Sequence, residues 1–425
     1  MKNILIITYY WPPTGGVGTQ RWLKLSKYLI RNKLKPIIYT PSNPTSPIKD
    51  LSTIDDIEKG VEVIKKDIFE PNKFFSIFNS SNLSSHILTK RPTSFWGKVL
   101  IWIRANFFVP DSRCLWIKPS VSFLNNYLKK KPVDLVISSG PPHSMHLIAL
   151  ELRKQHNIKW IADFRDPWTN IEYFDLLPLM KKQRKKHIFL EKKVIENADL
   201  VLTVSETWSN DFKKNGLKKI EVLNNGYDDD DFAARRNHNS YDFKICHFGL
   251  YGEKRDHSFF WQVLRNISDE NPDFNKKLKL IFAGEVHSNF FLNLESYRFK
   301  KKIKYHSHLK HNDVVDYMLD SDLLLVSQAD TKSVMGRLPA KLFEYIGARR
   351  PILAIGKKDS DLEKIISKIS FGWFVDFGNK NLLKQSINEI FSLSKNYEFE
   401  DVTSDYSRLN QAKRLTKIIN SLCEK

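Results

Sequence analysis

The sequence from Ile4 to Arg31 reads ILIITYYWPPTGGVGTQRWLKLSKYLIR, and this stretch sets the expected fold class. Ile4–Thr8 is a short β-branched run typical of a buried strand, and residues 22–31 have the apolar spacing of a helix. Between them lies a turn that contains Gly15, Gly16 and Gly18. Such a turn lets backbone N–H groups and the helix N-terminus approach an anion. A plain tight turn without a ligand is the alternative interpretation.

The glycine turn fails to match two common nucleotide-binding motifs. In a dinucleotide-binding fingerprint the third glycine would stand at Arg21, and a bulky side chain there prevents close packing of helix on strand. The next strand then ends at Thr40 and Pro41 without an acidic residue for a ribose. A phosphate-binding P-loop would need Gly-Lys-Ser/Thr after the turn, and that sequence does not follow.

The same strand-then-helix alternation continues along the whole chain. Continuous apolar strands that alternate with helical patterns indicate parallel sheets covered on both faces. The expected strands of the first half are Ile4–Thr8, Pro36–Thr40, Val61–Lys65, Asp134–Ser138, Lys159–Asp163, Leu200–Val204 and Glu221–Leu223; those of the second half are Lys244–Phe248, Lys279–Ala283, Ile303–His306, Leu323–Ser327, Ile352–Ile355 and Trp373–Asp376. So many strands exceed one ordinary open sheet, so the sequence predicts two doubly wound α/β domains.

An acidic and polar stretch around residues 228–242 marks the expected domain boundary. We therefore expect a first domain at residues 1–232, with an irregular helical insertion at about 69–128. A second domain would follow at 233–405. Residues 406–425 have helical periodicity and form a separate C-terminal helix in this interpretation.

The composition is that of an ordinary globular protein with an excess of positive charge. The 425 residues are 41% hydrophobic and 27% charged, with a formal net charge of +20. That excess favours an anionic partner such as phosphates, acidic lipids or nucleic acid. Three widely spaced cysteines form neither a disulfide framework nor a zinc motif, which suits the cytoplasm. No signal peptide is visible and the most apolar stretch, 95–109, is short and interrupted by charges, so we expect a soluble or peripheral protein.

A cation and a carboxylate stand three residues apart in the second half of the chain. Lys341 and Glu344 share one face of a helix that is predicted to start near Pro339, close to its positive end. Lys341 and free backbone N–H groups would hold a diphosphate, and Glu344 could accept hydrogen bonds from a ribose diol. An ordinary surface ion pair, worth about 0.3 kcal/mol, is the alternative.

A second cationic candidate directly follows the strand Lys244–Phe248. The turn Gly249–Asp256 lies at the C-terminal end of a parallel strand, which is where open α/β sheets bind ligands. Arg255, more than Lys254, could clamp phosphate oxygens. A solvated charged turn is the alternative.

Five segments in this order resemble the family-4 retaining glycosyltransferases. They are residues 10–18 (YWPPTGGVG), 138–144 (SSGPPHS), 162–168 (ADFRDPW), 250–252 (LYG) and 339–345 (PAKLFEY). The second and third resemble a subgroup met in bacterial surface-polysaccharide clusters, such as those for capsule and lipopolysaccharide. The resemblance spans essentially the whole chain. It implies the GT-B architecture, with two Rossmann-like domains facing across a cleft and the C-terminal helix packing back on the first domain.

The resemblance also implies roles for individual residues. Arg255 and Lys341 would contact the donor diphosphate, Glu344 the ribose, and Leu309 with Lys310 the nucleobase, while the backbone around Gly15 and Gly16 would approach the same phosphates. The family often has a glutamate eight residues before the ribose glutamate, in contact with the transferred sugar. Gly336 stands there in this chain, with backbone N–H groups taking part of the role, and the donor sugar is left open.

In the expected reaction the negative charge develops on the leaving diphosphate. Fixed cations aimed there would lower the barrier, so Arg255 and Lys341 are predicted to be catalytic, with no metal ion and no cofactor beyond the nucleotide-diphosphate-sugar co-substrate. His143 and Asp166 follow strands of the first domain on the acceptor side. His143 could orient a hydroxyl or touch the donor sugar, or be an ordinary loop histidine. Asp166 could act there, or simply pair with Arg165.

The insertion and a later basic run suggest where an acceptor is held. Residues 90–118 mix basic residues, among them Arg91, Lys98 and Arg104, with Trp and Phe side chains, and residues 181–187 read KKQRKKH. Basic residues among interfacial aromatics suit peripheral contact with anionic lipid headgroups, as a lipid-linked acceptor at the inner face of a membrane would require. In the alternative interpretation, the aromatic side chains belong to the core and the charged side chains are simply solvated. Two other functions remain open: a basic nucleic-acid-binding protein, although no recognition motif is visible, and a GT-B-like nucleotide-sugar epimerase or hydrolase.

Overall fold

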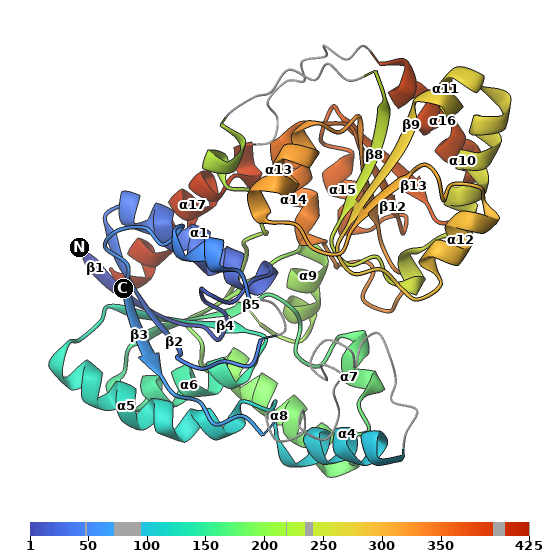
Figure 1. Cartoon of the computed structure of the whole chain (residues 1–425). Coiled ribbons are helices and arrows are strands. Elements are labelled where there is room, and N and C mark those ends of the chain that lie inside the picture. The colour runs from blue at the N-terminus through green and yellow to red at the C-terminus, as the bar shows by residue number, and fades with distance from the viewer. Residues whose placement is uncertain (47–48, 72–94, 218, 234–240, 394–403, 425) are drawn as a thin grey trace. The chain divides into compact units, whose positions relative to one another are not determined.

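The computed structural model describes residues 1–46, 49–71, 95–217, 219–233, 241–393 and 404–424. The chain divides into two compact units, the first made of residues 1–224 and 411–425 and the second of residues 225–410. Each unit is built around one parallel sheet (Figure 1). The thirteen strands expected from the sequence are all present, with ends that differ by at most two residues.

The first unit contains a seven-stranded sheet in the order β3-β2-β1-β4-β5-β6-β7. Its strands are β1 (Lys2–Ile7), β2 (Leu34–Pro41), β3 (Glu62–Lys66), β4 (Leu135–Gly140), β5 (Lys159–Phe164), β6 (Leu200–Thr203) and β7 (Ile220–Val222). Its helices are α1 (Val17–Arg31), η1 (Leu51–Ile54), α4 (Phe95–Phe107), η2 (Cys114–Trp116), α5 (Ile117–Lys130), α6 (Ser144–His156), α7 (Glu172–Leu176), α8 (Lys181–Asn197), α9 (Glu206–Lys214) and most of α17 (Arg408–Cys423). Figure 1 shows α5, α6 and α8 along one face of the sheet and α1 with α17 along the other.

The order of this sheet follows from burial along its strands. All four residues from Ile4 to Ile7 in β1 are fully buried, which is the pattern of a central parallel strand covered on both faces. The edge strand β3 is largely half-exposed. The strand order reverses between β1 and β4, so the loops after these two strands diverge at the C-terminal edge of the sheet. Open α/β sheets bind ligands at such a point.

The second unit contains a six-stranded parallel sheet in the order β10-β9-β8-β11-β12-β13. Its strands are β8 (Phe243–Phe248), β9 (Leu278–Ala283), β10 (Ile303–His306), β11 (Leu323–Ser327), β12 (Ile352–Gly356) and β13 (Gly372–Asp376). Its helices are η3 (Asp229–Phe232), η4 (Glu253–Arg255), α10 (Ser258–Glu270), α11 (Pro272–Lys277), α12 (Phe290–Ser296), α13 (His311–Leu319), α14 (Ala340–Ala348), α15 (Asp361–Ile366), α16 (Lys380–Ser392) and η5 (Ser404–Tyr406).

Alternate residues of the central strands face two separate cores in this unit. In β11, Leu323 and Leu325 pack with α10 and α16, whereas Leu324 and Val326 pack with α13, α14 and α15. The period of two puts neighbouring side chains on opposite faces of the sheet, and both faces are apolar because helices cover both. This is the doubly wound arrangement that the sequence predicts.

The helix α17 packs on the first unit, as expected. Ala412, Leu415 and Ile419 are fully buried. The Lys2 ammonium donates to the Asn420 side chain at 2.8 Å, and Arg414 forms an ion pair with Glu221 on β7. The chain therefore passes between the two units twice, at Asn224–Asn225 and at Asn410–Gln411.

Several sequence expectations fall partly outside the described residues. Of the segment 69–128, which we interpreted as a helical insertion, the structure describes α4, η2 and most of α5 but not residues 72–94. The helix α5 packs against α6 as the crossover between β3 and β4. Lys90 and Arg91, as well as residues 234–240 of the expected boundary, also lie outside the described part.

Candidate active site

The loop after β8 forms the centre of the predicted donor site. Gly249 and Gly284, which follow β8 and β9, have φ angles of 113° and 122°, a region that favours glycine. A Cβ at Gly284 would lie 2.4 Å from the Gly249 carbonyl oxygen, so the two backbones touch. The Gly249 and Tyr251 N–H groups donate to the Ala283 and Glu285 carbonyls at 2.7 and 2.8 Å. Only glycine allows this close approach, and it fixes the loop that leads to Arg255.

A buried carboxylate holds the far end of the same loop. The Asp256 side chain is 1% exposed. It accepts hydrogen bonds from His287 Nε2 and Asn293 Nδ2, both at 2.7 Å, and from Trp261 Nε1. Asp256 thus ties the residue next to Arg255 to α10 and α12. Sequence reasoning missed this role, because the partners lie up to 37 residues away in the chain.

Arg255 and Lys341 both lie near the end of β8 in the second unit. The Arg255 guanidinium donates to the Leu250 carbonyl at 2.9 Å, and Ser327 at the end of β11 donates to the Arg255 carbonyl at 2.6 Å. Lys341 Cγ passes 3.9 Å from where a Cβ of Gly249 would stand. Burial lowers the pKa of His247 on β8 to about 4, and the positive charges of Arg255 and Lys341 add to that shift. Both cations therefore act on the same point at the end of β8.

Glu344 lies one helical turn from Lys341 and forms an ion pair with it. Both belong to α14, which follows β11, the sheet neighbour of β8. Their side chains are 29% and 17% exposed, so the pair is more buried than an ordinary surface pair. The Tyr345 hydroxyl accepts a hydrogen bond from the Phe248 N–H at 2.9 Å, which ties α14 to the end of β8. The structure thus brings Arg255, Lys341 and Glu344 to one edge of the second sheet.

His311 is a further residue of this edge that the sequence analysis did not identify. Burial alone would lower its pKa, but a hydrogen bond to Asp231 at 2.9 Å and the negative charge of Glu344 outweigh burial and raise it. The predicted base-binding residues Leu309 and Lys310 directly precede His311 at the start of α13. The influence of Glu344 on His311 indicates that this loop approaches α14. The sequence signal that could have identified His311 is its place, as a polar residue shortly after the strand β10.

Gly336 occupies a buried loop between β11 and α14. The neighbouring Arg337 carbonyl accepts a hydrogen bond from Gln328 Nε2 at 2.7 Å, and the Met335 carbonyl accepts one from the Asp361 N–H at 2.8 Å. The loop is thereby fixed through hydrogen bonds to its backbone carbonyls.

In the first unit, the glycine turn leads into α1 as the sequence predicts. Gly16 has a φ angle of 90° and precedes the first helical residue, Val17. The first turn of α1 has no acidic residue and no side-chain cap. Gly15 is buried and Gly16 exposed. The geometry suits an anion at this helix N-terminus.

Arg21 explains why this turn departs from the dinucleotide fingerprint. Its guanidinium is fully buried and binds the Asp163 carboxylate of β5 through Nη2 at 2.8 Å and Nε at 3.1 Å. It also donates to the Leu223 and Asn224 carbonyls. A buried, bidentate pair with further hydrogen bonds is costly to break on one side, by about 3–5 kcal/mol. Arg21 therefore joins α1, β5 and the end of the segment after β7.

His143 and Asp166 lie after neighbouring strands, β4 and β5. The His143 ring stacks on Trp168 with centroids 4.7 Å apart, is 6% exposed, and has neither ring nitrogen hydrogen-bonded in the described part of the chain. Burial, with the nearby His146 and Arg165 charges, lowers the pKa of His143 well below its ordinary value, so the ring is neutral. Asp166 is half-buried and interacts with the Arg165 charge, whose guanidinium donates to the Gly140 carbonyl at 3.4 Å.

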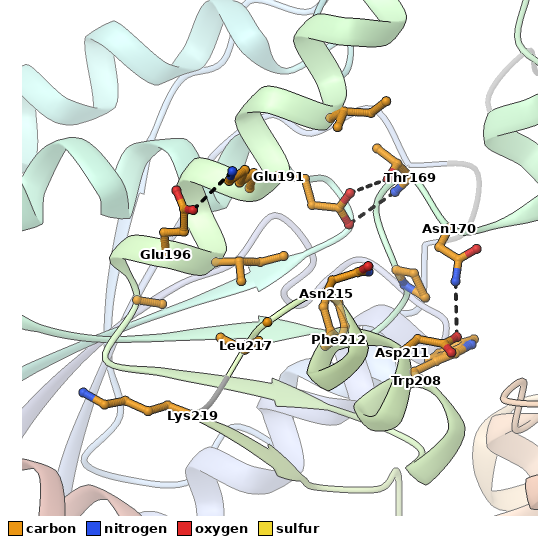
Figure 2. Close-up of a pocket in the computed structure, with 16 residues that line it drawn as sticks. Thr169, Asn170, Glu191, Glu196, Trp208, Asp211, Phe212, Asn215, Leu217 and Lys219 are labelled. Atoms are coloured by element: carbon orange, nitrogen blue, oxygen red, sulfur yellow. Dashed lines mark hydrogen bonds and ion pairs between the residues drawn. The ribbon is translucent and has the colours of Figure 1, made fainter.

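The first unit also contains a cavity of about 600 Å³ between α8 and α9 (Figure 2). Glu191 and Thr169 point toward one another there, and Asn170 donates to Asp211 at 3.2 Å. Burial raises the pKa of Glu191, although hydrogen bonds from Thr169 and Trp168 oppose the shift. None of the predicted site residues lines this cavity. Its walls come from helices on the flank of the sheet, and no short motif announces them.

Two kinds of feature are absent from the described residues. No group of three or more His, Cys, Asp or Glu side chains is placed there to hold a metal ion. No helix within the same residues has the length and apolar character needed to cross a membrane.

Comparison with known proteins agrees with the two-unit architecture. The model of Glycosyltransferase Family 4 matches residues 14–231, about half of the chain. No curated protein matches the sequence. Three similar solved structures are a glycosyltransferase from Rickettsia africae (15% identity, TM-score 0.63, covering 100% of this chain and 99% of that one), sucrose-phosphate synthase from Thermosynechococcus elongatus (13%, 0.57, 100% and 97%), and WaaG, a glycosyltransferase involved in lipopolysaccharide biosynthesis (13%, 0.54, 99% and 97%).

At such identities the structures show a shared fold, which is GT-B with two Rossmann-like domains. The family match covers most of the first unit, including the glycine turn and the segments that carry His143 and Asp166. The chain belongs to glycosyltransferase family 4 and is a glycosyltransferase of the GT-B fold.

Proposed function

We propose that the protein is a retaining glycosyltransferase that moves a sugar from a nucleotide-diphosphate-sugar to a glycan or lipid-linked acceptor in cell-surface polysaccharide biosynthesis. The observation that carries this proposal is the presence of Arg255, Lys341 and Glu344 at one edge of the second sheet. Two cations match the two phosphates of such a donor, and a carboxylate matches the hydroxyls of its ribose. WaaG, of the same fold, is named as an enzyme of lipopolysaccharide biosynthesis.

In the proposed reaction, the bond between the sugar and the diphosphate breaks while negative charge grows on the leaving phosphate. Arg255 and Lys341 stabilise that charge, so their interaction is stronger in the transition state than with the bound donor. The acceptor hydroxyl attacks from the face that the diphosphate leaves, and its proton passes to a phosphate oxygen. No metal ion is needed in this scheme because the two side chains supply the positive charge.

The first unit supplies the acceptor side in this proposal. Both nitrogens of the buried His143 ring are without a hydrogen-bond partner in the described part of the chain, and in this proposal one of them meets the acceptor hydroxyl when the substrate binds. Asp166 lies one strand away and its charge is shared with Arg165. Gly15 and Gly16, with the first N–H groups of α1, would contact the donor phosphates. Leu309 and Lys310 would contact the nucleobase, and the Gly336 loop the transferred sugar.

A thermal-shift screen with nucleotide-sugars tests the proposal first, because a ligand that binds only the folded state raises the melting temperature. Glu344→Ala should weaken nucleotide binding. Lys341→Ala should raise the activation barrier for transfer by about 2–4 kcal/mol, as loss of an oxyanion-hole donor does, and so slow the reaction roughly 30- to 1000-fold. Lys154→Ala is the matched control, because Lys154 forms an ordinary exposed i,i+3 pair with Glu151.

Three results would contradict the proposal. Unchanged nucleotide affinity and turnover in both site variants would remove the assigned roles. Retention on DNA without protection by UDP or GDP would favour a nucleic-acid-binding protein. Release of the nucleotide without any acceptor glycan would indicate a hydrolase.

A further inference from the structure

The helix α4 carries large aromatic side chains on the surface of the first unit. Phe95, Trp96, Trp102 and Phe107 are 72%, 73%, 40% and 67% exposed. Of the thirteen residues of α4, only Gly97, Ala105 and Asn106 are buried. An apolar helix is normally covered by other parts of a protein. Here the apolar side chains face outward, and such a patch marks an interaction surface.

Contacts with the rest of the first unit hold α4 in place. At about 100° per residue, the four exposed aromatics fall within an arc of about 140°; Gly97 and Arg104 lie outside this arc, whereas Asn106, in the last turn, lies within it and is held by hydrogen bonds. The Arg104 Nη1 atom is covered. Asn106 Nδ2 donates to the Pro178 carbonyl at 2.9 Å, and the Met180 N–H donates to Asn106 Oδ1 at 2.7 Å. The outward direction of the aromatics is therefore set by packing and hydrogen bonds.

These hydrogen bonds place α4 beside the start of α8, as Figure 1 also shows. The first two turns of α8 contain five exposed cations, Lys181, Lys182, Arg184, Lys185 and Lys186. Only Arg184, through Asp175, is in an ion pair within the described part of the chain. The N-terminus of a helix is its positive end, so cations there are unfavourable for folding. Cations that oppose the helix dipole without a compensating contact indicate that this end of α8 has a function.

Apolar side chains continue among these cations. Met180, Ile188 and Phe189 are 40%, 50% and 61% exposed. They flank or share the outer face of α8, whereas His187 and Glu191 face inward and are buried. Aromatic and aliphatic groups interleaved with lysines suit the boundary between headgroups and acyl chains, where rings enter the interface and ammonium groups meet phosphates. Bare phosphate, as in a nucleic acid, would leave the apolar part of this surface in water.

We propose that α4 and the first half of α8 form a docking surface for an anionic phospholipid bilayer. The aromatics of α4 enter the interface, and the lysines of α8 contact acidic headgroups. This inference deepens the lipid-linked acceptor of the proposed function and rests on it for its purpose, but its geometry is independent of the donor site.

Co-sedimentation of the full-length protein with vesicles tests this surface. Vesicles of phosphatidylcholine with 30 mol% phosphatidylglycerol should bind the protein at low salt, where the attraction between lysines and acidic headgroups is least screened. Pure phosphatidylcholine vesicles carry no net charge, so they should bind the protein at least tenfold more weakly. A lysine variant, with Lys181→Gln, Lys182→Gln, Lys185→Gln and Lys186→Gln, should have a partition coefficient at least tenfold lower than the wild type. An aromatic variant, with Phe95→Ser, Trp96→Ser and Trp102→Ser, should show a loss of the same size. The matched control removes four exposed lysines elsewhere on the same unit, Lys129, Lys130, Lys213 and Lys214, each replaced by Gln, and should bind as the wild type does.

Some outcomes would overturn the inference. They are equal binding to both vesicle types, unchanged binding of both variants, an equal loss in the control, or loss of self-association rather than vesicle binding in the aromatic variant. The lysine variant changes only exposed side chains, so it keeps the test decisive should the aromatic variant fold poorly. Both variants should keep the thermal shift with nucleotide-sugar, and Lys341→Ala should keep vesicle binding, so failure of this surface and failure of the donor site are distinguishable.

Discussion

The Lys341–Glu344 ion pair joins two side chains that a bound nucleotide-sugar would separate. In the proposed complex Lys341 contacts phosphate and Glu344 contacts ribose hydroxyls. An i,i+3 pair contributes only a few tenths of a kcal/mol, so exchanging it for ligand contacts costs little. In the unliganded protein the pair keeps both groups at the end of β8 and satisfies their charges.

His311 predicts a pH dependence of stability. Its pKa is raised in the folded protein by Asp231 and Glu344 against burial. A raised pKa stabilises the fold fully below the pKa of the unfolded chain, and the stabilisation is lost as pH rises through the folded value. His311→Gln should therefore lower the free energy of unfolding by about 1 kcal/mol at pH 5.5, and by less at pH 9. Urea unfolding at both pH values measures this.

The exposed neighbour His308 offers the control for that experiment. His308→Gln should change stability little at either pH. An equal cost of His311→Gln at both pH values would show that the hydrogen bond, rather than the charge on the ring, carries the effect.

At the scale of elements, the loop after β8 depends on a carboxylate that a short motif does not reveal. Asp256→Asn leaves His287, Asn293 and Trp261 with a neutral partner in a buried place. Because buried hydrogen bonds to a charged group are worth about 1.5–3 kcal/mol, we expect a loss of about 2 kcal/mol in the free energy of unfolding. The loop that carries Arg255 should loosen as well and raise the KM for the donor.

Asp269→Asn serves as the comparison for Asp256. Asp269 forms an exposed i,i+4 pair with Arg265 on α10, so its removal should cost less than about 0.5 kcal/mol. Chemical denaturation of both variants gives the two values. Similar small losses would contradict the anchoring role of Asp256.

Elements were predictable from the sequence because the apolar runs of parallel strands are local signals. β11 is buried along its whole length, and β1 and β8 are buried except near their first residues. Long-range pairs were not predictable: Arg21 and Asp163 are 142 residues apart, and His311 and Asp231 are 80 apart. Arg21 looked like a defect in a glycine motif, and only its partner on β5 explains it. The cavity between α8 and α9 has no sequence signal because it arises from the spacing of two helices.

At the scale of the whole molecule, α17 makes the first unit discontinuous. Leu415→Ala should destabilise that unit by about 3 kcal/mol, since Leu415 is fully buried and leaves a cavity. Amide hydrogen exchange should accelerate in β6 and β7 but not in β8 and β9. Lys417→Ala changes an exposed residue of the same helix and should leave both groups of strands unchanged. Equal acceleration in both units would show that they unfold together.

That discontinuity also orders events during synthesis. Domains generally fold as units and the N-terminal one first, but here residues 411–425 leave the ribosome only after all of residues 225–410. Until then, the places of Ala412, Leu415 and Ile419 are empty on the nascent first unit, and apolar surface there stays open to chaperones or to misassociation. The second unit has no such delay, so it should reach its native state earlier than the unit that is translated before it.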